Sequence, residues 1–286
     1  MTAVITSEQV MSLRSRTGAG VMDCKSALKE TAGDLTKAVE LLRKKGLAGL
    51  ARRAGRMMKE GVVALKTSPD AKTYAMIEIN CETDFVAKNP EVTDLARELL
   101  SSMLADAAPA NPAENASAKE KLQAAAMKMG ENMQIRRGVV YHAGPASAVN
   151  FYLHSDARKA AMVEVEFDGE LSAAKAGLLD LAKELAMQAV AMHPKWLRKE
   201  DVPAELLAKE QEIYKASPTA PGKTGIGLEK MLKGRVNKFY QEACLLEQAS
   251  IRDSKLSVLQ TVKNLAAKLG GNITVKRFDC YIVGVE

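Results

Sequence analysis

The chain has 286 residues, of which 47% are apolar, so we expect two or three modules with cores of their own. It contains no apolar run of the roughly 18 residues that cross a bilayer, and residues 1–6 lack the basic start and apolar stretch of a signal peptide. These features exclude a membrane-spanning or secreted protein and predict a cytoplasmic one.

The net charge of +6 comes from the N-terminal part of the chain. Residues 1–60 contain 12 Lys or Arg and 6 Asp or Glu, and the rest of the chain contains 29 of each sign. The densest basic stretch could meet phosphates or an acidic protein, and a solvated helix is an equally good interpretation. It consists of Arg43, Lys44, Lys45, Arg52, Arg53, Arg56 and Lys59.

Residues 6–45 are predicted to form three short helices. Thr6 and Gln9 have the spacing of a capping box, and Asp23 and Asp34 are the expected N-caps of the second and third helices. Breaks are expected at glycines 18, 20, 33 and 46. We therefore predict a helical domain over residues 1–46 and a linker over residues 47–60.

A pattern of strands and a helix then occurs twice. Strands predicted over 62–66 and 74–80 precede a helix that begins at Asn89 and Pro90, where Asn caps and Pro suits the first turn. The strings AMIEI and DLAREL of this copy return as AMVEV and DLAKEL, both at a shift of 86 residues. A shift shared by strand and helix predicts a duplicated α+β subdomain, with copies over 61–145 and 146–286.

Each copy is predicted to end with a further strand, over 134–141 in the first and 272–283 in the second. The second copy also contains an insertion at about 203–243. Helices over 204–216 and 228–243, joined by a Pro- and Gly-rich loop, predict a helical hairpin there. Residues 107–117, rich in Ala, Pro and Asn, are predicted to form a surface loop.

Residue patterns that carry catalysis are few. The three histidines have neither the mutual spacing nor the neighbours of a metal site, and the four cysteines form no CxxC pair, which favours reduced, buried thiols. The strings GAG at 18–20 and PGKT at 221–224 are parts of nucleotide-binding motifs, but the other glycine and the leading strand of each motif are missing. We predict no metal, no cofactor and no catalytic centre.

The two copies differ in the loop that follows the central strand. The first has Cys-Glu-Thr-Asp-Phe-Val-Ala-Lys-Asn at 81–89, and the second has Phe-Asp-Gly-Glu-Leu at 167–171. Phe85 is therefore an aromatic residue on a polar loop that the shared fold does not require. Two interpretations stay open from the residues alone: an anchor for a partner, or a side chain folded onto its own core.

Several strings along the chain resemble the elongation factor Ts family. They are TDFVA at 83–87, RTGAGVMDCKSAL at 16–28, IRR at 135–137, YLH at 152–154, GRVNKF at 234–239, LEQ at 246–248 and RF at 277–278. Because they are specific and occur in the family's order through almost the whole chain, we expect the chain to be a member.

This resemblance implies a fold and a partner. The fold would be α+β, with a three-helix domain like a ubiquitin-associated (UBA) domain and a duplicated core whose second copy bears a coiled-coil hairpin. The partner would be elongation factor Tu, in its GDP-bound and nucleotide-free forms, in a heterodimer or a 2:2 complex. The chain would act as its guanine nucleotide exchange factor, without direct contact with nucleic acid or membrane.

The resemblance also implies contact residues. Thr83, Asp84, Phe85 and Val86 would form the exchange loop, with Asp84 and Phe85 intruding beside the magnesium and phosphate site of Tu. In the N-terminal domain the implied contacts are Arg14, Val21 and Met22, and in the second copy His154. Three stretches depart from the family, at 156–161, 249–251 and 278–281, so the assignment of His154 rests on fewer matching neighbours.

Two other classes of function compete with this interpretation. An RNA- or ribosome-associated protein would use the basic N-terminal stretch, but the chain has no RNA-binding motif and few aromatic residues for stacking. A metabolic enzyme would need an acid–base pair or a nucleophile, and none stands out.

Overall fold

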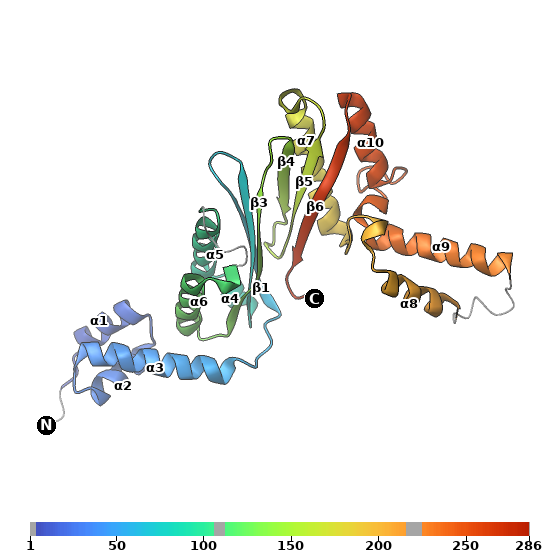
Figure 1. Cartoon of the computed structure of the whole chain (residues 1–286). Helices are drawn as coiled ribbons and strands as arrows, with labels where there is room; N and C mark the ends of the chain where they lie inside the picture. The colour runs from blue at the N-terminus through green and yellow to red at the C-terminus, as the bar shows by residue number, and fades with distance from the viewer. Residues whose placement is uncertain (1–3, 106–111, 216–224, 286) are drawn as a thin grey trace. The chain divides into compact units, whose positions relative to one another are not determined.

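The computed structural model describes residues 4–105, 112–215 and 225–285 (Figure 1). The chain forms two compact units. The first comprises Met1–Ser68, Ala75–Val140 and Val283–Glu286, and the second comprises Pro69–Tyr74 and Tyr141–Ile282. With helices at the N-terminus and two small sheets, the predicted α+β class is confirmed.

The first unit begins with three helices, as predicted: α1 (Ser7–Thr17), α2 (Val21–Glu30) and α3 (Leu35–Arg53). The capping box of Thr6 and Gln9 is present, and Asp34 caps α3 by accepting a hydrogen bond from the amide of Lys37 at 3.0 Å. Their small core is made of Val10, Leu13, Cys24, Ala27, Leu28 and Ala38.

Two predictions about these helices are wrong. The N-cap of α2 is Gly20, and Asp23 lies inside the first turn, where its negative charge suits the positive end of the helix dipole. Helix α3 does not break at Gly46 but continues to Arg53. A Cβ on Gly46 would come 2.6 Å from the sulfur of Met127, so a glycine here permits close packing of α3 on helix α6 (Ala116–Met129).

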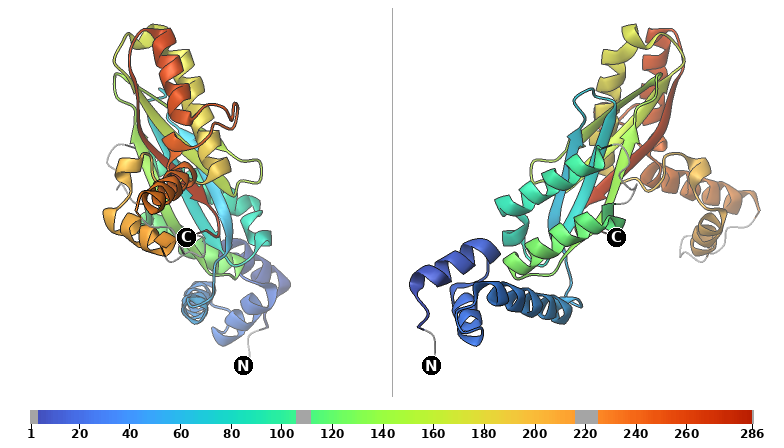
Figure 2. Two further views of the ribbon diagram at one scale, coloured as in Figure 1. Left: turned by 90° about the vertical axis from the view of Figure 1, so that its right-hand side faces the viewer. Right: turned by 60° about the vertical axis from the view of Figure 1, so that its left-hand side comes forward.

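The first sheet has the strand order β1-β2-β3, with β1 at Glu60–Thr67, β2 at Thr73–Cys81 and β3 at Met133–His142. Helix α5 (Pro90–Met103) packs on β1, and α6 runs beside α5 (Figure 2). Asn89 caps α5 and Pro90 occupies its first turn, as predicted. Between β2 and α5 lies a single helical turn, α4 (Asp84–Ala87).

The second sheet has the order β4-β5-β6, with β4 at Ser147–Leu153, β5 at Lys159–Phe167 and β6 at Ile273–Ile282, all antiparallel. Helices α7 (Leu171–Met192) and α10 (Val258–Leu269) pack on it and on each other. The central strand β5 and helix α7 supply most of the buried side chains of this unit's main core.

The repeated strings occupy matching places, the first on the central strand of each sheet and the second on the helix that follows it. Each central strand carries a buried glutamate paired with an arginine of the closing strand. Glu78 accepts from Nε of Arg137 at 2.7 Å, and Glu164 accepts from Nε of Arg277 at 2.7 Å. The duplication therefore preserves the ion pair of a buried glutamate with a partly exposed arginine, as well as a backbone pattern.

The predicted hairpin helices are α8 (Ala204–Lys215) and α9 (Ile226–Ala243), and most of the loop between them lies outside the described residues. Helices α6 and α10 and strand β4 were not predicted from the sequence. Residues 116 and 117 of the predicted surface loop belong to α6, and residues 112–114 form a 3₁₀ turn. Among the described helices, none is long and apolar enough to span a membrane.

Candidate functional site

The loop that distinguishes the first copy is a structured corner between β2 and α5. Thr83 has extended backbone angles and its hydroxyl accepts a hydrogen bond from the amide of Val86 at 3.4 Å, which starts α4. Two residues after the end of α4, the side-chain oxygen of Asn89 caps α5 by accepting a hydrogen bond from the backbone amide of Glu91 at 3.0 Å. The segment predicted as a polar loop is thus one helical turn with a cap on each side.

The side chains of this turn point in opposite directions. Phe85 is 83% exposed, whereas Val86 is buried. Of the two interpretations left open for Phe85, folding onto its own core is therefore wrong, and a large apolar side chain stands in solvent. Val86, expected beside it in the exchange loop, packs inward and holds the turn on the sheet.

Asp84 lies beside Phe85 and is ionised at neutral pH. Its carboxylate accepts a hydrogen bond from Lys88 Nζ at 2.7 Å, and this bond is the main cause that lowers the pKa of Asp84 below its usual value. Lys88 was not among the predicted site residues, although its spacing of four residues from Asp84 is the sequence signal for such a pair on a helical turn. Together these residues present an aromatic ring and a held negative charge on one exposed turn.

Beneath this turn lies Cys81, the last residue of β2, whose thiol is fully buried and donates to the carbonyl oxygen of Thr83 at 3.2 Å. Burial, and then the nearby Glu131 carboxylate, raise the pKa of this thiol to about 12. Since the thiolate is the reactive form of cysteine, the folded chain keeps Cys81 in its unreactive form at any physiological pH.

We therefore expect Cys81 to resist iodoacetamide at pH 8. Its alkylation in the folded chain should be at least about a hundredfold slower than in 6 M urea, because both burial and the raised pKa suppress attack. Mass spectrometry of peptides after timed quenching measures this rate. Cys280, which is half-buried, serves as the internal comparison, and equal rates for Cys81 with and without urea would contradict the assignment.

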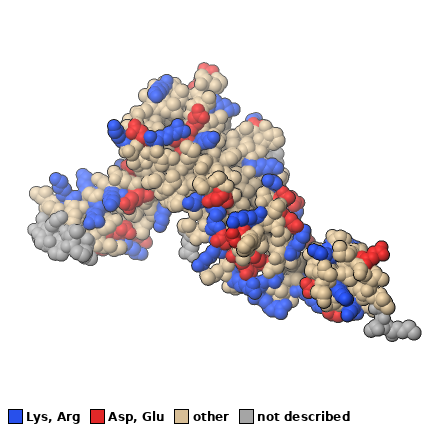
Figure 3. Space-filling model, turned by 180° about the vertical axis from the view of Figure 1, so that it is seen from behind, with Lys and Arg blue, Asp and Glu red and all other residues tan. Residues whose placement is uncertain are grey.

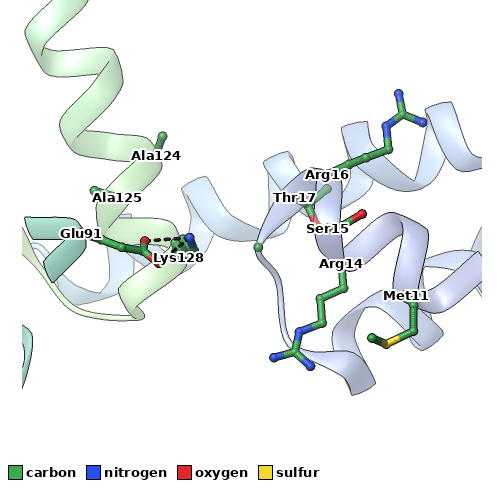
Figure 4. Close-up of a pocket in the computed structure, with 10 residues that line it drawn as sticks. Met11, Arg14, Ser15, Arg16, Thr17, Glu91, Ala124, Ala125 and Lys128 are labelled. Carbon is green, nitrogen blue, oxygen red and sulfur yellow. Dashed lines mark hydrogen bonds and ion pairs between the residues drawn. The ribbon is translucent and has the colours of Figure 1, made fainter. Parts of the chain in front are cut away.

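The residues expected to bind in the N-terminal domain lie on α1 and α2. Arg14 is on α1, and Val21 and Met22 open α2, where Met22 is 69% exposed and Val21 is also exposed. An open cavity of about 680 Å³ lies between α1 and helices α5 and α6, and Figure 4 shows Arg14 and Met11 on its α1 wall. On the opposite wall Lys128 forms an ion pair with Glu91 at 2.7 Å.

His154 belongs to the other unit and lies in the turn between β4 and β5. Its backbone amide donates to the carbonyl oxygen of Lys159 at 2.9 Å, and its Nδ1 lies 3.0 Å from the Asp156 carboxylate. The ring of Tyr152 meets the imidazole edge-on, with 6.3 Å between centroids. The imidazole is thus a half-exposed group held by its neighbours.

Several basic residues of the N-terminal stretch have acidic partners. Arg43 lies 3.8 Å from Glu120, Lys45 lies 2.5 Å from Glu30, and Arg56 lies 3.1 Å from Glu82. Figure 3 likewise shows acidic and basic side chains interspersed over the face it presents. These pairs favour the interpretation of a solvated, ion-paired surface over that of a phosphate-binding stretch. Among the described residues no three His, Cys, Asp or Glu side chains are grouped so that they could hold a metal ion.

Comparison with known proteins matches the chain to one family along nearly its whole length. The family described as Elongation factor TS matches residues 82–285. A protein named Elongation factor Ts from Symbiobacterium thermophilum is 43% identical, over 99% of this chain and 93% of that protein. Proteins of the same name from Trichlorobacter lovleyi and Clostridium botulinum are 39% and 40% identical, over 98% and 96% of this chain and 93% and 91% of their own lengths.

Proposed function

The chain belongs to the elongation factor Ts family of translation elongation factors, and from that membership we propose that it is the guanine nucleotide exchange factor of elongation factor Tu. It would bind Tu carrying GDP, promote release of GDP, and leave when GTP binds. It acts through binding energy and needs no catalytic centre or cofactor of its own. The cytoplasm, where translation takes place, is its proposed location.

The observation that carries this proposal is the exposure of Phe85. An aromatic side chain that is 83% exposed keeps its apolar surface in water until a partner covers it, and such anchors supply much of the binding energy of protein interfaces. The turn beneath it is capped by Thr83 and anchored by buried Val86. Because the turn is already ordered, docking meets little additional ordering cost.

Exchange then follows from linkage between two ligands of one GTPase. A partner that binds nucleotide-free Tu more tightly than GDP-bound Tu weakens GDP binding by the same factor. Phe85 would act as a wedge that displaces elements around the nucleotide. Asp84, which stays ionised at neutral pH, would place a negative charge beside the magnesium ion that bridges GDP to Tu. The charge competes with the groups that hold the ion.

The remaining contacts are proposed from the family pattern and the exposure of the residues. Arg14, Val21 and Met22 would hold Tu through the N-terminal helices, and His154 would hold it through the second copy. The proposed parts of the chain are a UBA-like domain over 1–46, a linker over 47–60 whose first residues, as far as Arg53, continue α3, and core copies over 61–145 and 146–286. The second copy bears α8 and α9 as a coiled-coil hairpin. The proposed complex contains one or two copies of each protein.

Release of a fluorescent GDP analogue from Tu tests the function. With excess unlabelled GDP as chase, we expect micromolar amounts of the chain to accelerate release by at least about a hundredfold, which corresponds to roughly 2.7 kcal/mol of barrier. Serum albumin at the same concentration is the control for nonspecific effects. Release at the unassisted rate, with the chain shown by circular dichroism to be folded, would remove the proposed function.

A further inference from the structure

Glu131, in the turn between α6 and β3, holds the residues that start α4. One carboxylate oxygen of Glu131 accepts from the backbone amides of Glu82 at 3.1 Å and Thr83 at 3.0 Å. The other oxygen accepts from the Thr83 hydroxyl at 2.5 Å. A side chain 48 residues away thus makes three hydrogen bonds to two consecutive residues, immediately before Asp84 and Phe85.

These bonds determine how α4 is presented. Because the Thr83 hydroxyl donates its proton to Glu131, its lone pairs are left to accept from the amide of Val86. A four-residue helix is far too short to be stable by itself. The direction in which Phe85 leaves the turn therefore depends on a cap that Glu131 orients.

The second copy of the subdomain shows which part of this arrangement the fold itself requires. There the turn reads Gly270-Gly271-Asn272 where the first copy has Gly130-Glu131-Asn132. In both copies the backbone amide of the asparagine donates a hydrogen bond to a carboxylate just after the central strand. Asn132 donates to Glu82 at 2.7 Å, and Asn272 donates to Asp168. The turn is closed in both copies, and Glu131 is an addition to it.

The second copy has no room for such an addition. A Cβ on Gly271 would come 2.7 Å from the ring of Phe167. At the shift of 86 residues, Phe167 corresponds to Cys81, a much smaller residue whose thiol lies near the Glu131 carboxylate. The carboxylate clamp and the small residue beneath it thus occur in the copy that carries Asp84 and Phe85, and in the other copy both are replaced.

We propose that Glu131 is a positioning residue for nucleotide exchange: it holds Thr83 so that Phe85 and Asp84 leave α4 in the direction that enters the partner. This inference rests on the proposed function. A positioning role can be told apart from a contribution to stability alone. If Glu131 acts through Phe85, replacing Glu131 no longer changes the rate of GDP release once Phe85 has been removed.

A double-mutant cycle tests the proposal. Rates of GDP release from Tu are measured with the wild type, Glu131→Ala, Phe85→Ala and the double variant. We expect Glu131→Ala to slow release about tenfold in the wild-type background and by less than about twofold in the Phe85→Ala background. The two effects should not add, because Glu131 acts by orienting Phe85. Glu131→Gln, which can still accept from both amides, should stay within about threefold of the wild type.

Asp168→Ala is the matched control, because it removes the bonds of Asp168 to Asn272 in the second copy, including one of 2.7 Å to the side-chain amide. It should lower the melting temperature by an amount similar to Glu131→Ala and leave release unchanged. Suppose that Phe85→Ala slows GDP release, but Glu131→Ala releases GDP at the wild-type rate or slows release equally in both backgrounds. The positioning role of Glu131 is then overturned, and the exchange function stands. If no member of the cycle, including the wild type, accelerates release, the proposed function fails and the inference with it.

Discussion

Replacing Phe85 with alanine should slow the release of GDP from elongation factor Tu by at least about thirtyfold relative to the wild-type chain. Truncating an interface anchor typically costs about 2 kcal/mol or more, and every 1.4 kcal/mol is a factor of ten. Phe85 is the largest side chain on the turn and is 83% exposed, so its burial by Tu would supply energy that the remaining contacts do not replace. Stopped-flow measurement with a fluorescent GDP analogue gives the rates.

The stability of the free chain separates this effect from unfolding. Because Phe85 makes little contact with the rest of the chain, its truncation should leave the melting temperature within about 1 °C of the wild type. Met57→Ala removes another strongly exposed apolar side chain of the same unit and should release GDP at the wild-type rate. If Asp84→Ala abolishes exchange while Phe85→Ala does not, the charge and not the wedge carries the mechanism.

The features that the sequence predicted well are those set by neighbours in the chain. The capping box of Thr6 and Gln9, the Asp34 cap and the Asn89–Pro90 start of α5 each depend on residues within one turn. The repeat was visible because strand and helix share one shift along the sequence. Such local rules need no knowledge of what packs against the element.

Contacts between distant residues account for the errors. Gly46 is a helix breaker by propensity, yet α3 runs through it because close packing on Met127 of α6 outweighs the roughly 1 kcal/mol cost of a glycine in a helix. Helix α6 itself was missed although Ala118, Leu122 and Ala126 recur every four residues and are buried. Two of these three are alanines, so the apolar stripe that they form is weak.

At the candidate site, too, features set by neighbouring residues were predictable and those set by distant contacts were not. The residue types at 83–85 were visible in the sequence, and the Thr83 cap follows local rules. The outward direction of Phe85 depends on Val86 packing inward and on Glu131, which reaches Thr83 from 48 residues farther along the chain. No local pattern connects these positions. What pointed to Phe85 from sequence was its absence from the second copy.

In the second copy, Arg277→Met should lower the free energy of unfolding by about 3 kcal/mol. Arg277 faces Glu164 across β5 and β6, with Nε 2.7 Å from the carboxylate, and its guanidinium carbon lies 3.8 Å from the centroid of the Tyr141 ring. Glu164 is almost fully buried, so loss of its partner leaves an uncompensated charge, which typically costs 3–5 kcal/mol. We expect the lower end because Arg277 itself is 45% exposed. Urea titration followed by circular dichroism measures the change.

Two further variants show whether the unpaired charge is the cause. Arg277→Met combined with Glu164→Leu removes both charges and should return to within about 1 kcal/mol of the wild type, since an apolar pair of similar volume often replaces a buried ion pair without loss. Arg137→Met in the first copy should lower the free energy of unfolding by less than Arg277→Met. Glu78 would keep a hydrogen bond from the Asn80 side chain at 3.0 Å and an ion pair with Arg136 at 3.5 Å. A double variant as unstable as the single one would mean that Arg277 stabilises the chain by its packing on Tyr141, and not by neutralising Glu164.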